Sequence, residues 1–446
     1  MSDLKHLART IFHRTLGAID IPAAFARKLA RSGSTIACGD DRLDLAKFER
    51  IRAIAFGKAA VAMARSLVKT ISPALRASDS HGARYFEGLL VAPVPMSEPV
   101  PGFRVIAAGH PLPDAGSLET GRAILDLLAD CDQSTLIFFL LSGGGSSLVE
   151  LPLDPSVTLA DVQALHRTLV TCGASIEEIN IVRKHISAVK GGRLAAAAPH
   201  STKITLGISD VPEGRESALA SGPTLPDPST VAGARRVVRE YGLAEKMPAS
   251  LAQHFLPNGI LPETPKPGDP EFRNSHFALI LGLHDLIHPA HCAAEAGGCI
   301  TICDNSTDDW PVARAADHLL RQLVHLRDLN PGRRVAVIAD GEVSSPVTGD
   351  GIGGRNAAFV LDCVAKIAGR PIAVLSAGTD GIDGSSPAAG AVADGQTIDR
   401  ARALSLDPAD FQRRSDSYSF FKALDDTIET GPTGNNLRDL RILIAE

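Results

Sequence analysis

Five loops, four of which contain glycine, carry side chains that could bind or transfer an anionic group. Glycine lets backbone N–H groups face an anion, Asp and Glu supply oxygen ligands for Mg²⁺, and Lys and Arg supply positive charge. Each loop follows a short apolar run that we predict to be a β-strand. Any one of them could be an ordinary turn, but five at strand ends indicate a ligand site. In chain order the loops are 57–60, 142–147, 209–212, 340–356 and 378–384.

The loop 142–147 has the strongest pattern, with three glycines between serines. It follows the apolar run 135–141, which places its N–H groups between a strand end and a helix start, where negative charge is favoured. We predict a cradle for phosphate or carboxylate; the alternative is a tight turn with a serine cap. The loop is not a Walker A motif, a nucleophile elbow or a dinucleotide fingerprint. Its candidate binding residues are Ser142, Gly143, Gly144, Gly145, Ser146 and Ser147.

Two basic residues could neutralise a transferring phosphoryl group. Lys58 follows Gly57 at the end of the predicted strand 51–56, where open α/β sheets bind ligands. Arg355 ends a glycine run, and its planar guanidinium can hold an oxyanion with two parallel hydrogen bonds. The alternatives are a solvated lysine at a strand end and an ordinary glycine loop.

Four acidic residues in these loops could bind Mg²⁺ or move a proton. Asp210 follows the predicted strand 204–208, and Asp380 lies in the last glycine loop; both are candidate Mg²⁺ ligands. Asp383 or Glu342 could orient or deprotonate a substrate hydroxyl, and both stay open as the general base.

Three histidines, His284, His288 and His291, have a spacing that could bind a metal on one helix face. We predict no metal site there, because Pro289 should interrupt the helix and no carboxylate has a fitting spacing. The histidines are expected to be surface or half-buried residues.

The loops must be positioned by strands that alternate with helices. This order predicts a mainly parallel α/β sheet, followed by a second α/β half. Five prolines in 256–273 predict a linker, so we expect domains at 1–255 and 274–446. The predicted strands are 51–56, 89–93, 103–107, 135–141, 204–208, 277–281, 334–338, 372–375 and 440–444. The predicted helices include 3–32, 117–128, 159–171, 176–188 and 283–296.

Composition excludes several classes of protein. The 446 residues are 44% hydrophobic and 22% charged, as in globular domains, which rules out a disordered chain or a coiled coil. A net charge of −6 indicates no basic face for nucleic acid or an anionic membrane. The seven sparse cysteines indicate reduced thiols, and no signal peptide or membrane-length apolar run is recognised. We expect a soluble cytoplasmic protein.

Taken together, the loops resemble those of the class II glycerate kinases, also called glycerate 2-kinases, whose C-terminal half is a MOFRL domain. The similarity covers nearly the whole chain, and the motifs occur in family order. The matching segments are 57–60 with Met63, 110–114, 142–148, 182–187, 190–192, 209–212, 220–228, 353–356, 378–384, 416–418 and 431–434, with Asn436 and Asp439.

The resemblance implies two three-layer α/β/α domains: a Rossmann-like N-terminal domain and a C-terminal one that contains the MOFRL region at about 332–440. It implies ATP- and Mg²⁺-dependent phosphorylation of D-glycerate at the 2-hydroxyl, giving 2-phosphoglycerate and ADP. Lys58 and Arg355 would be the functional basic pair and would meet the substrate together with Asn356, while Lys190 joins the phosphate-binding candidates. The expected partners are ATP and D-glycerate, without nucleic acid or membrane, and a homodimer is the assembly to test.

Three positions depart from the family pattern. The segment 213–216 lacks the expected Gly-Asp-Asp-Pro beside Asp210, Ala358 replaces an acidic residue, and Asn435 replaces a threonine. A non-catalytic sensor of nucleotide or hydroxy acid is therefore one alternative function. The other is an NAD(P)H-dependent hydroxypyruvate reductase, a name that some family members carry. A reductase would need a dinucleotide-binding motif that the sequence lacks.

Overall fold

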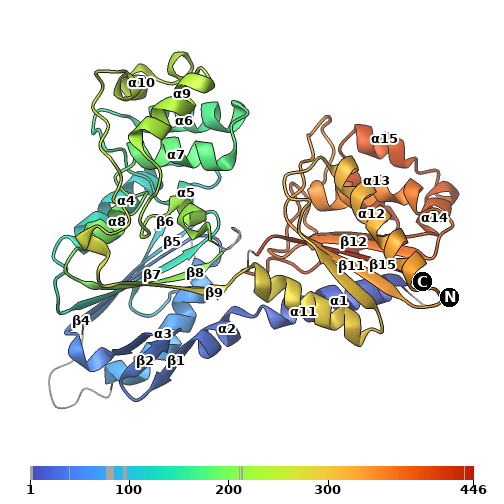
Figure 1. The fold of residues 1–446 in the computed structure, drawn as a ribbon, viewed down its shortest axis with the longest axis horizontal. Helices are drawn as coiled ribbons and strands as arrows, with labels where there is room; N and C mark the ends of the chain where they lie inside the picture. Colours follow the sequence, from blue (N-terminus) through green and yellow to red (C-terminus); the bar gives the residue numbers. More distant parts are fainter. Residues whose placement is uncertain are drawn as a thin grey trace. The chain divides into compact units, whose positions relative to one another are not determined.

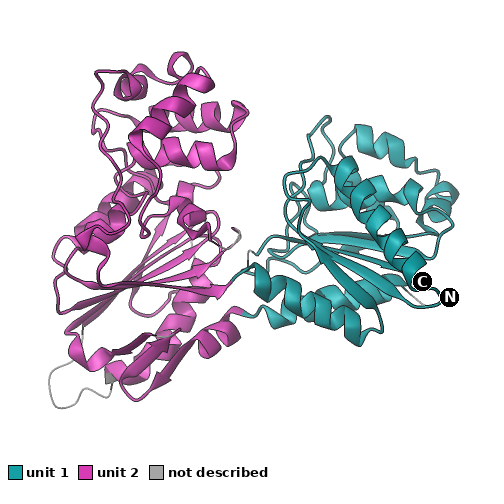
Figure 2. Cartoon of the chain, in the orientation of Figure 1, with its two compact units in different colours: residues 1–20, 282–446 teal, residues 21–281 magenta. Residues whose placement is uncertain are grey.

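The computed structural model describes residues 4–39, 41–76, 85–93, 98–209, 211, 214–435 and 437–446. The chain forms two compact units (Figure 2). Unit 1 contains Met1–Asp20 and Gly282–Glu446, and unit 2 contains Ile21–Leu281. Unit 2 is thus inserted into unit 1 along the chain.

Unit 2 is built on a parallel six-stranded sheet. Its strands are β4 (Arg50–Phe56), β5 (Tyr85–Ala92), β6 (Phe103–Ala107), β7 (Thr135–Ser142), β8 (Thr202–Ile208) and β9 (Ser275–Leu281). Their order is β6-β5-β4-β7-β8-β9, and every neighbouring pair is parallel. Every residue of β7 is buried, as expected of a central strand covered on both faces.

Helices cover both faces of this sheet (Figure 1). The helices of unit 2 are α2 (Ile21–Lys28), α3 (Ala60–Arg76), α4 (Ala115–Leu128), α5 (Gly145–Leu148), α6 (Leu159–Thr171), α7 (Ile176–Ile186), α8 (Arg193–Ala196), α9 (Val231–Glu240) and α10 (Ala249–Phe255). Alternate residues of β7 pack with α4, α5 and α8 on one face, whereas α3 packs on the other. A separate apolar core joins α6, α7, α9 and α10.

Two smaller kinds of element complete unit 2. A three-stranded antiparallel sheet is formed by β1 (Leu29–Ser32), β2 (Thr35–Cys38) and β3 (Asp41–Asp44). Short 3₁₀ turns lie at Leu45–Lys47, Glu216–Ser221, Leu243–Glu245 and Pro270–Phe272.

Unit 1 contains a mixed sheet. Its strands are β10 (Ile300–Asp304), β11 (Val335–Asp340), β12 (Ile372–Gly378), β13 (Gly390–Asp394), β14 (Thr427–Ile428) and β15 (Asp439–Ala445), in the order β10-β11-β15-β12-β13-β14. The last strand, β15, lies in the middle and runs antiparallel to both neighbours.

Four long helices enclose this sheet: α1 (Leu4–Ala18) and α11 (Leu283–Ala296) on one face, and α12 (Val312–Leu329) and α13 (Arg355–Lys366) on the other (Figure 1). Three short helices, α14 (Thr397–Ala403), α15 (Pro408–Arg413) and α16 (Ser417–Ala423), follow β13. The predicted fold class, two α/β domains with a parallel N-terminal sheet, is confirmed. Among the described residues, no helix is both long and apolar enough to cross a membrane.

The units are divided differently from the predicted domains. Segment 256–273 is packed within unit 2, where the buried Thr264 donates its hydroxyl to Asp227 Oδ2 at 2.9 Å. The chain instead passes between units near residues 20 and 281, and its first helix packs in unit 1. The predicted helix 3–32 also ends earlier, and α11 runs through Pro289, where we expected an interruption.

Candidate active site

The loops after β4 and β7 are fastened to each other in unit 2. These strands are parallel neighbours, so their carboxyl ends lie at the same sheet edge. The N–H of Lys58 donates to the carbonyl of Gly143 at 2.9 Å, and the N–H of Ala59 donates to Ser142 Oγ at 2.9 Å. Two of the predicted loops therefore form one structure, and the Lys58 side chain lies exposed beside the triple glycine.

Two glycines make this close approach possible. At Gly57, with φ +117°, a Cβ would lie 2.3 Å from Ser142 Oγ. At Gly144, with φ +82°, a Cβ would lie 3.0 Å from Nε2 of His110 and 3.3 Å from Cγ of Lys58. The triple-glycine loop thus packs directly against Lys58 and against His110, to which we gave no separate role from the sequence.

His110 is a neutral polar group beside Lys58. Partial desolvation at this sheet edge, together with the positive charge of Lys58, lowers the pKa of His110 below its ordinary value of 6.5. Near pH 7 the imidazole therefore supplies one hydrogen-bond donor and one acceptor, without a second positive charge.

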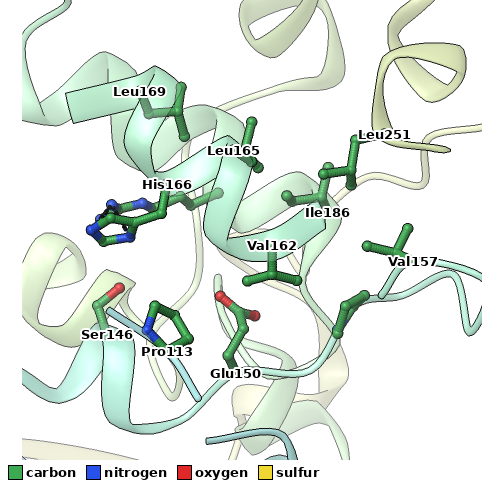
Figure 3. A pocket seen from close by; sticks show the side chains of 12 residues that line it. Pro113, Ser146, Glu150, Val157, Val162, Leu165, His166, Leu169, Ile186 and Leu251 are labelled. Carbon is green, nitrogen blue, oxygen red and sulfur yellow. Dashed lines mark hydrogen bonds between the residues drawn. The ribbon is translucent and has the colours of Figure 1, made fainter. Parts of the chain in front are cut away.

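The three serines of the loop have different surroundings. Ser142 holds Ala59, and Ser147 Oγ donates to the carbonyl of Gly144 at 3.4 Å, so both stabilise the loop itself. Ser146 Oγ lies 2.8 Å from Ser221 Oγ and lines a cavity (Figure 3). Among the serine side chains of the loop, Ser146 is thus the one that lines this cavity.

Lys190 is held in the interior of unit 2. Its side chain is 2% exposed, and Nζ donates to Glu150 Oε2 at 2.7 Å and to the carbonyl of Val149 at 2.9 Å. Burial lowers the pKa of Lys190, and the Glu150 carboxylate opposes that shift. These contacts give Lys190 structural partners, and its predicted binding of phosphate stays a prediction.

In unit 1, Arg355 is the first residue of α13 and forms ion pairs with two carboxylates. Its Nε lies 2.5 Å from Asp439 Oδ2, and its Nη2 lies 2.7 Å from Glu342 Oε1. Burial alone would lower the pKa of Arg355, but the two carboxylates outweigh burial and raise it. Asp439, at the start of β15, is a functional candidate that its motif contained but to which we gave no role.

Asp383 and Asn356 build the start of α13. The carboxylate of Asp383 accepts the N–H groups of Asn356 at 3.0 Å and Ala357 at 2.8 Å, and its side chain is buried. The amide of Asn356 donates to Asp383 and accepts from Ser376 Oγ at 2.6 Å. Both residues are therefore committed to supporting the helix that carries Arg355.

The metal candidates are only partly placed. Asp380 Oδ1 accepts the N–H of Ile382 at 3.1 Å, and it faces the same side of Gly378 as Asp439. Asp210 lies outside the described residues. No group of three or more His, Cys, Asp or Glu side chains in the described part of the chain is arranged to hold a metal ion. Mg²⁺ often needs only one or two carboxylates beside substrate phosphates, which Asp380 could satisfy.

Known proteins resemble this chain over most of its length. The MOFRL family matches residues 335–439, and DUF4147, a domain of unknown function, matches residues 7–256. A D-glycerate 2-kinase of Thermotoga maritima is 36% identical over 88% of this chain and 90% of its own length. A protein of Agrobacterium vitis, provisionally named hydroxypyruvate reductase, is 35% identical over 80% of this chain and 81% of its own.

A solved structure of a glycerate kinase is also similar to this chain. The crystal structure of a glycerate kinase from Thermotoga maritima superimposes with a TM-score of 0.82 at 32% identity and covers 100% of both chains. The resemblance inferred from the loop motifs is confirmed by these matches.

The contacts of Lys190 predict a loss of stability when it is replaced. Lys190→Met leaves the Glu150 carboxylate without its cation in the interior, which should lower the free energy of unfolding by about 3–5 kcal/mol. Urea unfolding of the two proteins measures this difference. A variant as stable as the wild type that has lost its turnover would instead return Lys190 to phosphate binding.

Asp383 predicts a pH-dependent change in stability. Burial raises its pKa to about 6, above the ordinary 3.8, although the N–H donors of α13 oppose the shift. Between these values the folded state binds more protons than the unfolded state, so this contribution to stability falls as the pH rises. Relative to Asp383→Asn, the wild type should lose roughly 2 kcal/mol between pH 4 and pH 6.5. Urea unfolding across this range would contradict the assignment if the difference stayed constant.

Proposed function

We propose a function from one premise: the chain belongs to the family of proteins that join a DUF4147 domain to a MOFRL domain. Its similarity to glycerate kinases shows the same membership. It is a glycerate kinase, an enzyme that transfers a phosphoryl group to glycerate. We further propose that ATP is the donor, that the 2-hydroxyl of D-glycerate is the acceptor, and that the product is 2-phosphoglycerate. The observation that carries this proposal is the fastening of Lys58 to the triple-glycine loop.

Phosphoryl transfer mainly requires positioning and charge neutralisation. The loop 142–147 would receive phosphate oxygens on its backbone N–H groups, and the ammonium of Lys58 would meet the charge that develops on the transferring group. Because Lys58 and Ala59 are joined to the loop by backbone N–H groups, the Lys58 side chain starts at a fixed distance from the cradle.

Arg355 has the geometry to receive an anionic oxygen. Asp439 occupies its Nε edge and Glu342 occupies Nη2, whereas none of the hydrogen bonds or ion pairs among the described residues uses Nη1. The side chain is 37% exposed. We propose that Nη1 meets the transferring phosphoryl group or the substrate carboxylate, while Asp439 keeps the guanidinium plane in place.

The candidates for orienting the substrate hydroxyl differ in their exposure to solvent. Both oxygens of Asp383 accept backbone N–H groups of α13, whereas Glu342 is partly exposed beside Arg355. We therefore propose Glu342 for this role. Asp380 would hold Mg²⁺ together with substrate phosphates, and Asp210 is the second candidate ligand. The ion would neutralise part of the negative charge on the phosphate oxygens.

One assay separates kinase, reductase and sensor. ATP consumption is measured across a panel of small hydroxy acids, with the position of the product phosphate determined by NMR. D-Glycerate phosphorylated at the 2-hydroxyl is the expected result. NADH-dependent turnover of hydroxypyruvate without ATP consumption would establish the reductase suggested by the name of the Agrobacterium vitis relative. Binding of ATP without consumption by any hydroxy acid would establish a sensor.

Lys58→Met tests catalysis against mere binding. The change removes the charge but keeps a long apolar side chain, so kcat should fall by at least about a hundredfold, while KM and Tm change little. Lys69→Met, which removes an exposed lysine from α3 in the same unit, is the matched control and should keep normal turnover. Turnover of Lys58→Met at half the wild-type level or more would defeat the assignment.

Arg355→Lys tests the guanidinium geometry. An ammonium cannot hold Asp439 along one edge and also present a second nitrogen to substrate, so we expect at least a tenfold loss of turnover, about 1.4 kcal/mol. Steady-state kinetics with D-glycerate measure the loss. Unchanged kinetics would remove Arg355 from the site.

The positioning role of Asp439 predicts coupling to Arg355. Asp439→Asn should lower kcat in the wild type but have little further effect in Arg355→Lys, because the carboxylate acts through the guanidinium. Asp426→Asn is the matched control, since Asp426 is also a buried unit-1 carboxylate paired with an arginine, Arg400. Its effect should be the same in both backgrounds. Additive effects of Asp439→Asn and Arg355→Lys would contradict the positioning role.

A further inference from the structure

A cavity in unit 2 lies beside the triple-glycine loop and is not used by the mechanism above. It is enclosed by the segment after β6, by α5 and by the helices α6 and α7 (Figure 3). Ser146, Glu150 and His166 line its polar part, and apolar side chains such as Leu165 and Val162 line the rest. Arg183 of α7 also lines it. The cavity therefore combines a loop hydroxyl with a guanidinium.

Arg183 has a hydrogen-bond partner but, among the residues that the structure describes, no counter-ion. Its Nη2 donates to Nδ1 of His166 at 2.8 Å, and it takes part in none of the ion pairs within 4.0 Å among the described residues. The nearby carboxylate of Glu150 is committed elsewhere, because it accepts Lys190 Nζ at 2.7 Å and Ser187 Oγ at 2.6 Å.

The charges around the cavity do not cancel. Glu150 balances Lys190, and His166 is uncharged near pH 7, because burial and the neighbouring Arg183 lower its pKa to about 4. Among the described side chains that line the cavity, the guanidinium of Arg183 is left as one excess positive charge. It is partly buried, and desolvation lowers its pKa. Desolvating a cation without a counter-ion lowers the stability of the folded protein. A bound anion would offset this loss of free energy.

We propose that Arg183, with His166 and Ser146, forms an anion-binding subsite for a carboxylate or phosphate group. Guanidinium binds such groups through two parallel hydrogen bonds, and the hydroxyl of Ser146 offers a further donor. This subsite rests on the proposed function in one respect: its ligand is the phosphate of the nucleotide or the carboxylate of the hydroxy acid. Ser146 belongs to both the subsite and the proposed phosphate cradle, so the two are continuous.

The test is anion binding by the full chain without turnover. Isothermal titration calorimetry is performed with inorganic phosphate, D-glycerate and a non-hydrolysable ATP analogue on the wild type, Arg183→Met and Arg167→Met. Arg167 is exposed on α6 next to His166, so its replacement removes the same charge outside the cavity. Arg183→Met should weaken phosphate binding at least tenfold, and Arg167→Met less than twofold.

The other two ligands identify the source of the anion. A loss confined to the ATP analogue assigns the subsite to the nucleotide, and a loss confined to D-glycerate assigns it to the substrate carboxylate. Equal phosphate affinity in Arg183→Met and the wild type, or no phosphate binding by the wild type, overturns the proposal.

A measurement on the wild type covers the case in which Arg183→Met does not fold. Hydrogen exchange across 159–186 should slow when phosphate is added, and unchanged exchange overturns the subsite. Kinase turnover is measured separately. A protein that binds phosphate through Arg183 but phosphorylates no hydroxy acid would refute the proposed function and leave the subsite standing.

Discussion

The close backbone contact between the ends of β4 and β7 is the constraint on which the unit-2 site depends. Two hydrogen bonds join the chain at Lys58 and Ala59 to the triple-glycine loop, and they form only because Gly57 lacks a Cβ. The parallel sheet brings the two strand ends together, and the missing side chain lets them touch. The position of an exposed, flexible lysine is thereby set by backbone atoms, which move much less than side chains do.

Unit 1 positions its cation by a different means. The guanidinium of Arg355 is held by carboxylates that come from the ends of β11 and β15, and the helix on which it lies is itself capped by a buried aspartate. Arg183 in unit 2 shows the opposite arrangement, a partly buried guanidinium with a neutral partner. The two arginines would therefore meet an anion differently: Arg355 would present Nη1 from a guanidinium that its carboxylates hold in place, whereas Arg183 would gain a charge partner.

The sequence predicts local features well and distant partners poorly. Strand 103–107 and helices 159–171 and 283–296 have the predicted bounds, because their apolar periodicity is complete within the segment. The glycine loops at 57–60, 142–147 and 378–384 also lie at strand ends, as predicted. By contrast, the roles of Lys190, Asp383 and Asp439 depend on partners about 27 to 84 positions away, which residue type and spacing do not reveal. The two compact units differ from the predicted domains for the same reason, since prolines signal an irregular chain but not what it packs against.

The insertion of unit 2 into unit 1 has a consequence for synthesis of the chain. All of unit 2 is synthesised before residues 282–446 of unit 1. Unit 2 can therefore fold around its complete parallel sheet while α1 still lacks the unit-1 elements against which it packs. The central strand of unit 1, β15, comes after the other described strands along the chain, and both β11 and β12 pair with it. The sheet of unit 1 is therefore completed only once β15 has been synthesised, and a chain that stops before β15 lacks the strand that joins its two halves.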